Sequence, residues 1–87
     1  MKLSVDMTVL LFGVTRDIVG TGSLKIPATA AKGLKTVEDL KTHLKKVYPG
    51  LKDLSSLAVA VNQSYAGDHD PIQNTDEIAL IPPVSGG

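Results

Sequence analysis

Cysteine is absent from this sequence. Its absence excludes disulfide bonds, cysteine-ligated metal sites and any side-chain thiol that would act as a nucleophile or carry sulfur. If the chain takes part in sulfur chemistry, the sulfur must therefore be carried by another group.

Long hydrophobic runs are also missing. No apolar stretch approaches the ~20 residues that a membrane-spanning helix needs, and Asp6 interrupts the N-terminal segment where a signal peptide would be apolar. With 87 residues, of which 43% are hydrophobic, we expect one compact domain in a soluble, cytoplasmic protein.

Neither sign of charge is in excess, because nine basic residues balance nine acidic ones. This balance argues against a nucleic-acid-binding protein. The charges are nevertheless segregated: residues 25–52 hold seven lysines against two acids, a surplus of five, and residues 53–87 hold five acids and no base. Two interpretations stay open: solvated faces that keep the protein soluble, or an acidic half that steers the chain toward a basic partner pocket.

Familiar catalytic and cofactor motifs are missing as well. No GxSxG nucleophile motif is present, the glycines of residues 13–22 do not complete a dinucleotide-binding GxGxxG, and no P-loop lysine follows them. The Asp-His-Asp run at 68–70 contains possible metal ligands, but adjacent residues seldom converge on one ion. We expect no metal site and no bound cofactor, and we interpret His43 as a surface or boundary residue.

Apolar periodicity defines the first half of the chain. Apolar and polar residues alternate over 3–11 and again over 23–26, which predicts two strands joined by an elaborated loop. Leu10 and Phe12 fall on the polar side of the first strand, so they are either covered by a later loop or exposed for a partner.

The second half begins with the clearest helix. Thr36 is a good N-cap with Asp39 three residues later, an apolar stripe recurs at helical spacing over 37–47, and Pro49 ends the segment. Residues 57–61 are apolar throughout and are followed by Asn62, and the segment 57–62 predicts a central strand buried on both faces. Residues 77–81 predict a last strand that Pro82 ends.

These elements predict an α+β fold with a mixed four- to five-stranded sheet and one main helix packed across one face. Two hairpin-like pairs with a helix between them suit a β-grasp roll, whereas a ferredoxin-like sheet would need a second full helix. We expect a β-grasp domain over residues 1–81 and a flexible PPVSGG tail over 82–87.

The tail has an unusual order of residues. Pro82 and Pro83 have fixed φ angles and should project the chain outward. Gly86 and Gly87 lack a Cβ and fit a narrow channel. The terminal carboxylate, with a reference pKa of roughly 3.3–3.7, is ionised at neutral pH and can attack the α-phosphate of ATP.

Three segments carry a family resemblance: FGVTRDIVG (12–20), AVAVNQSY (58–65) and, above all, DEIALIPPVSGG (76–87). They resemble the small subunit of molybdopterin synthase (the MoaD type), a ubiquitin-like β-grasp sulfur carrier, and the resemblance runs through the whole chain. Asn74-Thr75 stands where an Asp-Gly turn is common, and Asp17 where glutamate is usual.

The resemblance implies a function in molybdenum cofactor biosynthesis. An E1-like activating enzyme would use ATP to adenylate the carboxylate of Gly87, and a sulfur donor would convert it to a thiocarboxylate. The tail, with Gly86 before the reacting residue, would then enter the large synthase subunit and donate sulfur to cyclic pyranopterin monophosphate. The chain would be no enzyme on its own, since catalytic residues are expected in the large subunit of a heterotetramer. No nucleic acid and no membrane are expected as partners.

Candidate partner contacts follow from the same resemblance: Phe12, Tyr65, Ile81, Pro82, Pro83, Val84 and Ser85. Leu80 is a further candidate, but strand alternation must send either Leu80 or Ile81 into the core. Arg16 is interpreted as a structural or rim contact.

Other function classes stay open. A sulfur carrier for thiamine or another thio-cofactor would share the tail chemistry, and a ubiquitin-like modifier would join Gly87 to a target lysine. A binding domain with a Ser-Gly tail from cloning would explain neither the diproline nor the upstream segments. The sequence does not distinguish molybdenum from tungsten as the final metal.

Overall fold

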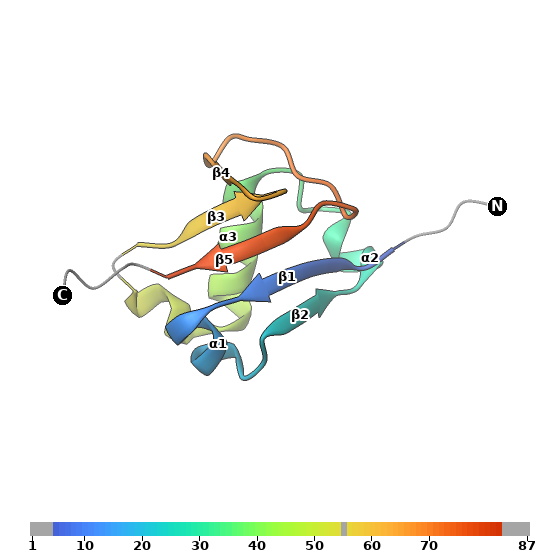
Figure 1. Ribbon diagram of the computed structural model, residues 1–87. Coiled ribbons are helices and arrows are strands. Elements are labelled where there is room, and N and C mark those ends of the chain that lie inside the picture. The colour runs from blue at the N-terminus through green and yellow to red at the C-terminus, as the bar shows by residue number, and fades with distance from the viewer. Residues whose placement is uncertain (1–4, 55, 83–87) are drawn as a thin grey trace.

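The computed structural model describes residues 5–54 and 56–82. Five strands, three α-helices and one 3₁₀ helix make up this part of the chain (Figure 1). In chain order they are β1 (Met7–Leu11), α1 (Gly13–Val19), β2 (Ser23–Ile26), α2 (Ala28–Ala31), α3 (Val37–Val47), η1 (Pro49–Asp53), β3 (Ala58–Val61), β4 (Ser64–Ala66) and β5 (Ile78–Ile81).

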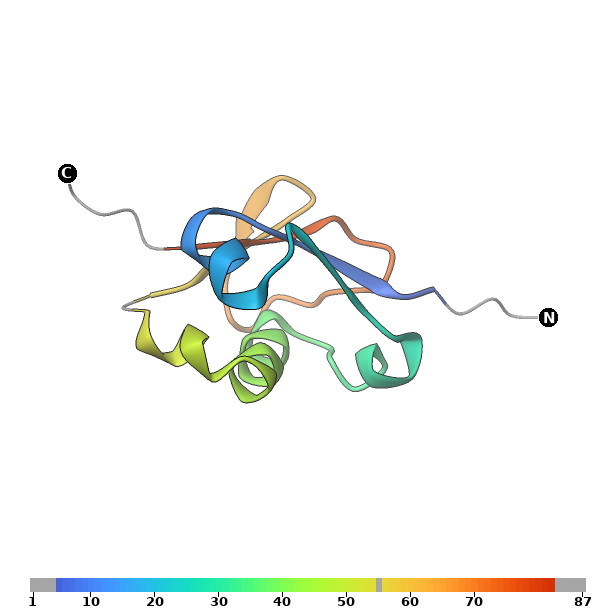
Figure 2. The same cartoon turned by 90° about the horizontal axis from the view of Figure 1, so that it is seen from below.

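The five strands form one mixed sheet in the order β2-β1-β5-β3-β4. The middle strand, β5, is parallel to its neighbour β1, and every other neighbouring pair is antiparallel. The main helix α3 and the η1 turn lie on one side of this sheet, as the view from below shows (Figure 2). This arrangement confirms the predicted α+β, β-grasp architecture.

The core forms where the apolar stripe of α3 meets the covered face of the sheet. Met7, Val9 and Leu11 of β1 are buried, as the period-two pattern predicts, and so are Leu40 and Leu44 of α3. The remaining buried apolar residues are Ile26, Ala31, Val37, Leu51, Val59, Ile72, Ile78 and Leu80. Burial of side chains this size stabilises the fold by roughly 1.5–3 kcal/mol each, measured against full exposure.

The N-terminus of α3 is capped as predicted. The Thr36 hydroxyl accepts a hydrogen bond from the Asp39 N–H at 3.2 Å, and the Asp39 carboxylate accepts one from the Thr36 N–H at 3.2 Å. This reciprocal pair satisfies two N–H groups at the point where the helix begins.

The loop expected between the first two strands contains the helix α1, which the sequence reasoning missed. Its start is stabilised by Thr15, whose buried hydroxyl accepts a hydrogen bond from the Phe12 N–H and donates one to the Phe12 carbonyl. Its end is Gly20, which has a φ of 92° and donates its N–H to the Arg16 carbonyl. The left-handed conformation at this position favours glycine.

The strand predicted at residues 57–62 is present as β3 and pairs with a strand on each side, but its predicted burial on both faces was wrong. That strand, β3, lies between β5 and the edge strand β4, and the middle of the sheet is β5. Only Val59 of β3 is buried, whereas Ala58 and Ala60 are half-buried on the other face. The reason is that helices cover only one face of the sheet, so β3 needs only one buried face.

The first strand begins at Met7, so Val5 and Asp6 of the predicted strand precede it, and residues 3 and 4 lie outside the described residues. Asp6, just before it, accepts a hydrogen bond at 3.1 Å from the N–H of Ala28, where α2 begins. Within residues 5–54 and 56–82, no helix is both long enough and apolar enough to cross a membrane.

Candidate functional site

The face of the sheet turned away from α3 carries a row of small and apolar side chains. Strand pairing aligns Leu10, Ala79, Ala60 and Tyr65 across β1, β5, β3 and β4. The same register pairs Ala58 with Ile81 in the next row. We call this set, together with Phe12, the open face. Two alanines stand at the centre of the first row, so its large side chains, Leu10 and Tyr65, lie at the two ends.

Phe12 and Tyr65 are the most exposed members of the open face. Phe12 is 51% exposed and Tyr65 is 76% exposed. Phe12 follows directly after Leu11, whose partner across the ladder is Leu80, so it lies level with Ile81. Exposed aromatic side chains next to small residues are typical of protein-binding surfaces. The structure thus brings together three of the predicted partner contacts, Phe12, Tyr65 and Ile81, on one face.

Strand alternation separates Leu80 from Ile81. Leu80 is fully buried beneath α3, and Ile81 is half-buried on the open face. Leu80 is therefore a core residue, and its candidacy as a partner contact is withdrawn. Ile81 keeps its place among the candidates.

The turn from β1 into α1 lies against the base of the C-terminal tail. Gly13 has a φ of 55°, and a Cβ at this position would lie 3.1 Å from Cγ of Pro82. Any larger residue here would be strained and would press on Pro82. Phe12 and Gly13 therefore flank the point where the tail begins. The other predicted tail residues, Pro83, Val84, Ser85, Gly86 and Gly87, lie outside the described residues.

Sequence reasoning missed Gly13 and the three alanines as parts of this surface. Two features of the sequence could have indicated these residues. The alternate alanines of β3 and the single alanine of β5 indicate a strand face that meets no helix, and a glycine near the end of a strand indicates a tight turn. Arg16, predicted to be a structural or rim contact, is exposed and lies beside Gly22, where a Cβ would be 3.5 Å from the arginine Nε.

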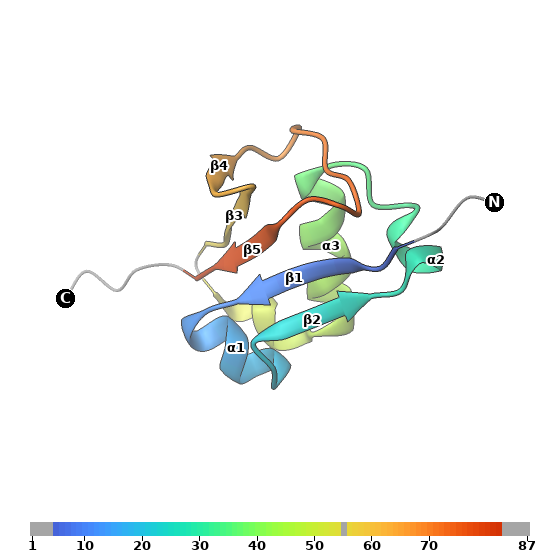
Figure 3. The same ribbon diagram turned by 45° about the vertical axis from the view of Figure 1, so that its right-hand side comes forward.

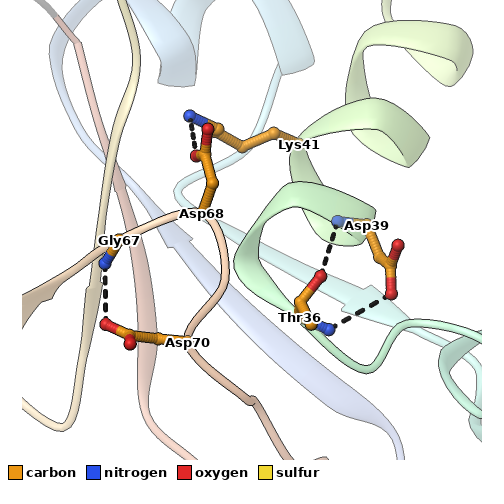
Figure 4. A network of polar contacts seen from close by, with 6 residues as sticks. All are labelled: Thr36, Asp39, Lys41, Gly67, Asp68 and Asp70. Carbon is orange, nitrogen blue, oxygen red and sulfur yellow. Dashed lines mark hydrogen bonds and ion pairs between the residues drawn. The ribbon is translucent and has the colours of Figure 1, made fainter.

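The Asp-His-Asp segment lies against the start of α3 (Figure 4). The carbonyls of Asp70 and Asp68 accept hydrogen bonds from the N–H groups of Val37 and Glu38, at 3.1 and 2.9 Å. Asp68 also forms an ion pair with Lys41, with 2.6 Å between Oδ1 and Nζ. Among the described residues, no group of three or more histidine and acidic side chains is placed to hold a metal ion.

Lys41 also controls the protonation of Asp68. The hydrogen bond from its ammonium group, followed by its positive charge, holds the pKa of the Asp68 carboxyl below the ordinary value of 3.8. The side chain of Asp68 is about half exposed, so solvent weakens this interaction.

The Val-Asn-Gln segment builds the turn between β3 and β4. Asn62 and Gln63 have φ angles of 53° and 71°, which two-residue hairpin turns of type I′ require. The Asn62 side chain accepts a hydrogen bond from the Glu77 N–H at 3.0 Å and donates one to the Asp76 carboxylate at 3.1 Å. This segment therefore positions the start of β5, the strand that leads to the tail.

Comparison with known proteins identifies the family of the chain. The model of the ThiS family matches residues 9–87. The chain belongs to the ThiS family. Its relatives include proteins named molybdopterin synthase sulfur carrier subunit from Arabidopsis thaliana and Dictyostelium discoideum. The Arabidopsis protein is 34% identical, and the match covers 97% of this chain and 85% of the relative. The Dictyostelium protein is 36% identical, and the match covers 98% of this chain and 100% of the relative.

A solved structure is similar to this ThiS-family chain in fold as well as in sequence. The solution structure of the small archaeal modifier protein 1 (SAMP1) from Methanosarcina acetivorans is 26% identical, with a TM-score of 0.72. The match covers 99% of this chain and all of that one. The likeness therefore extends over the whole β-grasp domain rather than a local motif.

Proposed function

We propose that this ThiS-family chain is a sulfur carrier in molybdenum cofactor biosynthesis, and serves as the small subunit of molybdopterin synthase. The observation that carries the proposal is full-length similarity, above 30% identity, to relatives named as molybdopterin synthase sulfur carrier subunits. The absence of cysteine supports it, because a carrier without a thiol must hold sulfur elsewhere, and the terminal carboxylate is the available group.

The chemistry proceeds in two steps on Gly87. Its carboxylate attacks the α-phosphate of ATP in the E1-like activating enzyme, which releases pyrophosphate and forms an acyl adenylate. A donor at the oxidation level of sulfide then attacks the carbonyl carbon, and AMP leaves with one of the former carboxylate oxygens. The product is a thiocarboxylate, and the chain itself binds no cofactor.

Sulfur transfer takes place in the large subunit. The tail, with Pro82, Pro83, Val84, Ser85 and Gly86 before the reacting residue, enters that subunit and gives its sulfur to cyclic pyranopterin monophosphate. Two such transfers form the dithiolene of molybdopterin. The catalytic residues of the transfer belong to the large subunit in a heterotetramer of two small and two large subunits.

The open face supplies the docking surface in this proposal. Phe12, Tyr65 and Ile81 contact the activating enzyme and the large subunit in turn, since the same tail must reach both active sites. Gly13 and Pro82 set the direction in which the tail leaves the domain, because they are packed against each other.

The intact mass of the chain tests the sulfur-carrier function. After incubation with ATP, an E1-like activating enzyme and a sulfur donor, we expect a mass gain equal to the difference between one sulfur and one oxygen atom, placed on Gly87 by fragmentation. A variant that lacks Gly87 should fold normally and show no gain. An unchanged mass, with the activating enzyme active on another carrier, would contradict the proposal.

Protein modification is a second candidate function. The solved structure from Methanosarcina acetivorans bears the name of a modifier protein, and it matches almost the whole chain. As a modifier, the chain would form an amide between the carbonyl of Gly87 and a lysine of the target. Conjugates of higher mass that depend on Gly87 would identify this activity, and their absence alongside thiocarboxylate formation would leave the carrier function alone.

A further inference from the structure

A groove lies between β2 and the C-terminal half of α3, on the helix-bearing side of the sheet and away from the open face. It has a volume of about 230 Å³ and is lined by Leu24, Lys25, Ile26, Pro27, Ala30, His43, Leu44, Val47 and Tyr48. The volume is below the roughly 300–1,000 Å³ of small-molecule sites, so the groove suits individual side chains rather than a cofactor.

One wall of the groove is an edge strand. Among the described residues, β2 pairs with β1 on one side, and it forms the outer strand of the sheet (Figure 3). Hydrogen-bonded pairs alternate along an antiparallel ladder. The Leu11 N–H donates to the Gly22 carbonyl at 2.9 Å, so the backbone groups of residue 22 point toward β1. The same holds for every second residue after it, which are Leu24 and Ile26. The N–H and carbonyl of Lys25 therefore point outward, where another strand can pair with them.

Two apolar side chains, Leu24 and Val47, lie where they can contact the side chains of a segment paired with β2. Leu24 is half-buried beside the buried Ile26, and Val47 of α3 is 51% exposed across from them. An extended segment that pairs with β2 would direct every second side chain between this strand and α3. The site thus offers both backbone partners and apolar contacts, the two elements of recognition by strand addition.

The charged residues at the groove indicate which residues should stand beside the apolar residues of a bound segment. Its lining contains Lys25 and His43 but no acidic residue. Lys46, three residues after His43, is exposed on the neighbouring surface of α3. This is also the part of the sequence where seven lysines outnumber two acids. A segment with carboxylates beside its apolar residues would be electrostatically complementary here.

We propose that the β2–α3 groove binds an extended segment of a partner protein, with alternating aliphatic side chains flanked by aspartate or glutamate. The segment adds to the edge of β2 through the backbone of Lys25. Its aliphatic side chains enter the groove beside Leu24 and Val47. Its carboxylates lie near His43 and Lys46 on α3 and, on the other face of β2, beside the Lys25 side chain, which is level with Thr8. A partner bound in this way leaves the open face and the tail available, so binding here is independent of sulfur-carrier activity.

An NMR titration of the full chain tests the site. The probe is a seven-residue peptide with the order Asp-Ile-Asp-Val-Asp-Ile-Asp, in which aliphatic and acidic side chains alternate. We expect chemical-shift changes at Lys25, Ile26, His43 and Val47, and slower hydrogen exchange at the Lys25 amide. A peptide with lysine in place of each aspartate should bind more weakly. So should a peptide with proline in place of the two aspartates next to the valine, because the residue opposite Lys25 must supply an N–H for pairing and proline has none.

Matched variants distinguish binding in this groove from nonspecific binding elsewhere on the surface. Val47→Asp should abolish binding, whereas Val14→Asp, at a valine of α1 that is 41% exposed outside the groove, should not change it. Lys46→Glu should weaken binding about fivefold, as for loss of an exposed ion pair, and Lys52→Glu should have less effect. All four variants are surface changes, and their amide spectra report whether they fold.

Three outcomes would overturn the proposal. They are the absence of shift changes at millimolar peptide, shift changes confined to the open face, and equal weakening by Val47→Asp and Val14→Asp. Because the titration uses neither the activating enzyme nor ATP, its failure would leave the sulfur-carrier proposal untouched.

Discussion

At the scale of single residues, the two faces of the sheet have different roles. Residues on the face covered by α3 stabilise the fold, and residues on the open face are available to bind a partner. Alternation in β5 places Leu80 in the core and Ile81 on the open face, so neighbouring residues of similar character have different roles. The same alternation in β1 buries Leu11 and leaves Phe12 at the surface.

Ile81→Lys should weaken binding to the large synthase subunit and to the activating enzyme by about tenfold or more, because a charge would enter an apolar interface. The domain should remain folded, since Ile81 lies outside the core. Calorimetric titration against each partner measures the effect. Val47→Lys, at an exposed valine on the helix side, is the control. Unchanged affinity for Ile81→Lys would remove the residue from the interface.

The ion pair between Lys41 and Asp68 predicts a pH effect. The pKa of Asp68 is lowered in the folded protein, so the pair stabilises the fold at pH values above the ordinary pKa of 3.8. That contribution is lost as the pH falls through the lowered pKa.

Lys41→Met should return the pKa of Asp68 toward its ordinary value, which carboxyl carbon shifts measured against pH would show. The difference in unfolding free energy between Lys41→Met and the parent should be small at neutral pH and should vanish in strong acid. A pKa that stays low in the variant would assign the shift to another group.

At the scale of elements, polar turn residues hold the strands and helix in register. The backbone carbonyls of Asp68 and Asp70 complete the start of α3, and Asn62 links the β3–β4 turn to the start of β5. Each contact joins residues far apart in the sequence, so each fixes one element against another.

Asn62→Ala should lower the free energy of unfolding by about 1–3 kcal/mol, because alanine is strained at a φ of 53° and two side-chain hydrogen bonds are lost. Gln63→Gly, at a φ of 71° in the same turn, should raise the free energy of unfolding by about 0.5–1 kcal/mol. Urea denaturation measures both. Equal destabilisation by the two variants would show that the turn conformation is not the cause.

At the scale of the whole molecule, one small core supports both surfaces. A domain of this size has a total stability of about 5–15 kcal/mol, so a single core truncation removes a large part of it. The acids of the second half also contribute, because Asp68, Asp70 and Asp76 each accept hydrogen bonds or form an ion pair within the fold. These contacts indicate that the acidic residues of the second half stabilise the fold, and they favour this role over steering the chain toward a basic partner pocket.

Leu40→Ala should lower the free energy of unfolding by about 2–5 kcal/mol, since Leu40 is fully buried between α3 and the sheet. The melting temperature should fall by at least about 10 °C. Val47→Ala, on the same helix but half exposed, should change the stability by no more than about 0.5 kcal/mol. Similar losses for both variants in thermal denaturation would contradict this assignment of the core.

Much of the architecture follows from the sequence alone. The alternation in residues 7–11, the stripe and cap of α3, and the last strand were each predictable because local periodicity reports which side chains a regular element buries. The chemistry expected on the terminal carboxylate, which rests on the Gly-Gly ending and the lack of cysteine, stays a prediction.

Other features were decided only by the tertiary structure. The helix α1 depends on a hydroxyl that bonds to the backbone three residues earlier, and seven residues are too few for a clear periodic signal. The position of β3 near the edge, the choice of Leu80 over Ile81 for the core, and the groove beside β2 depend on which strands pair and which face α3 covers. Strand order is a property of long-range contacts, and local sequence patterns do not encode it.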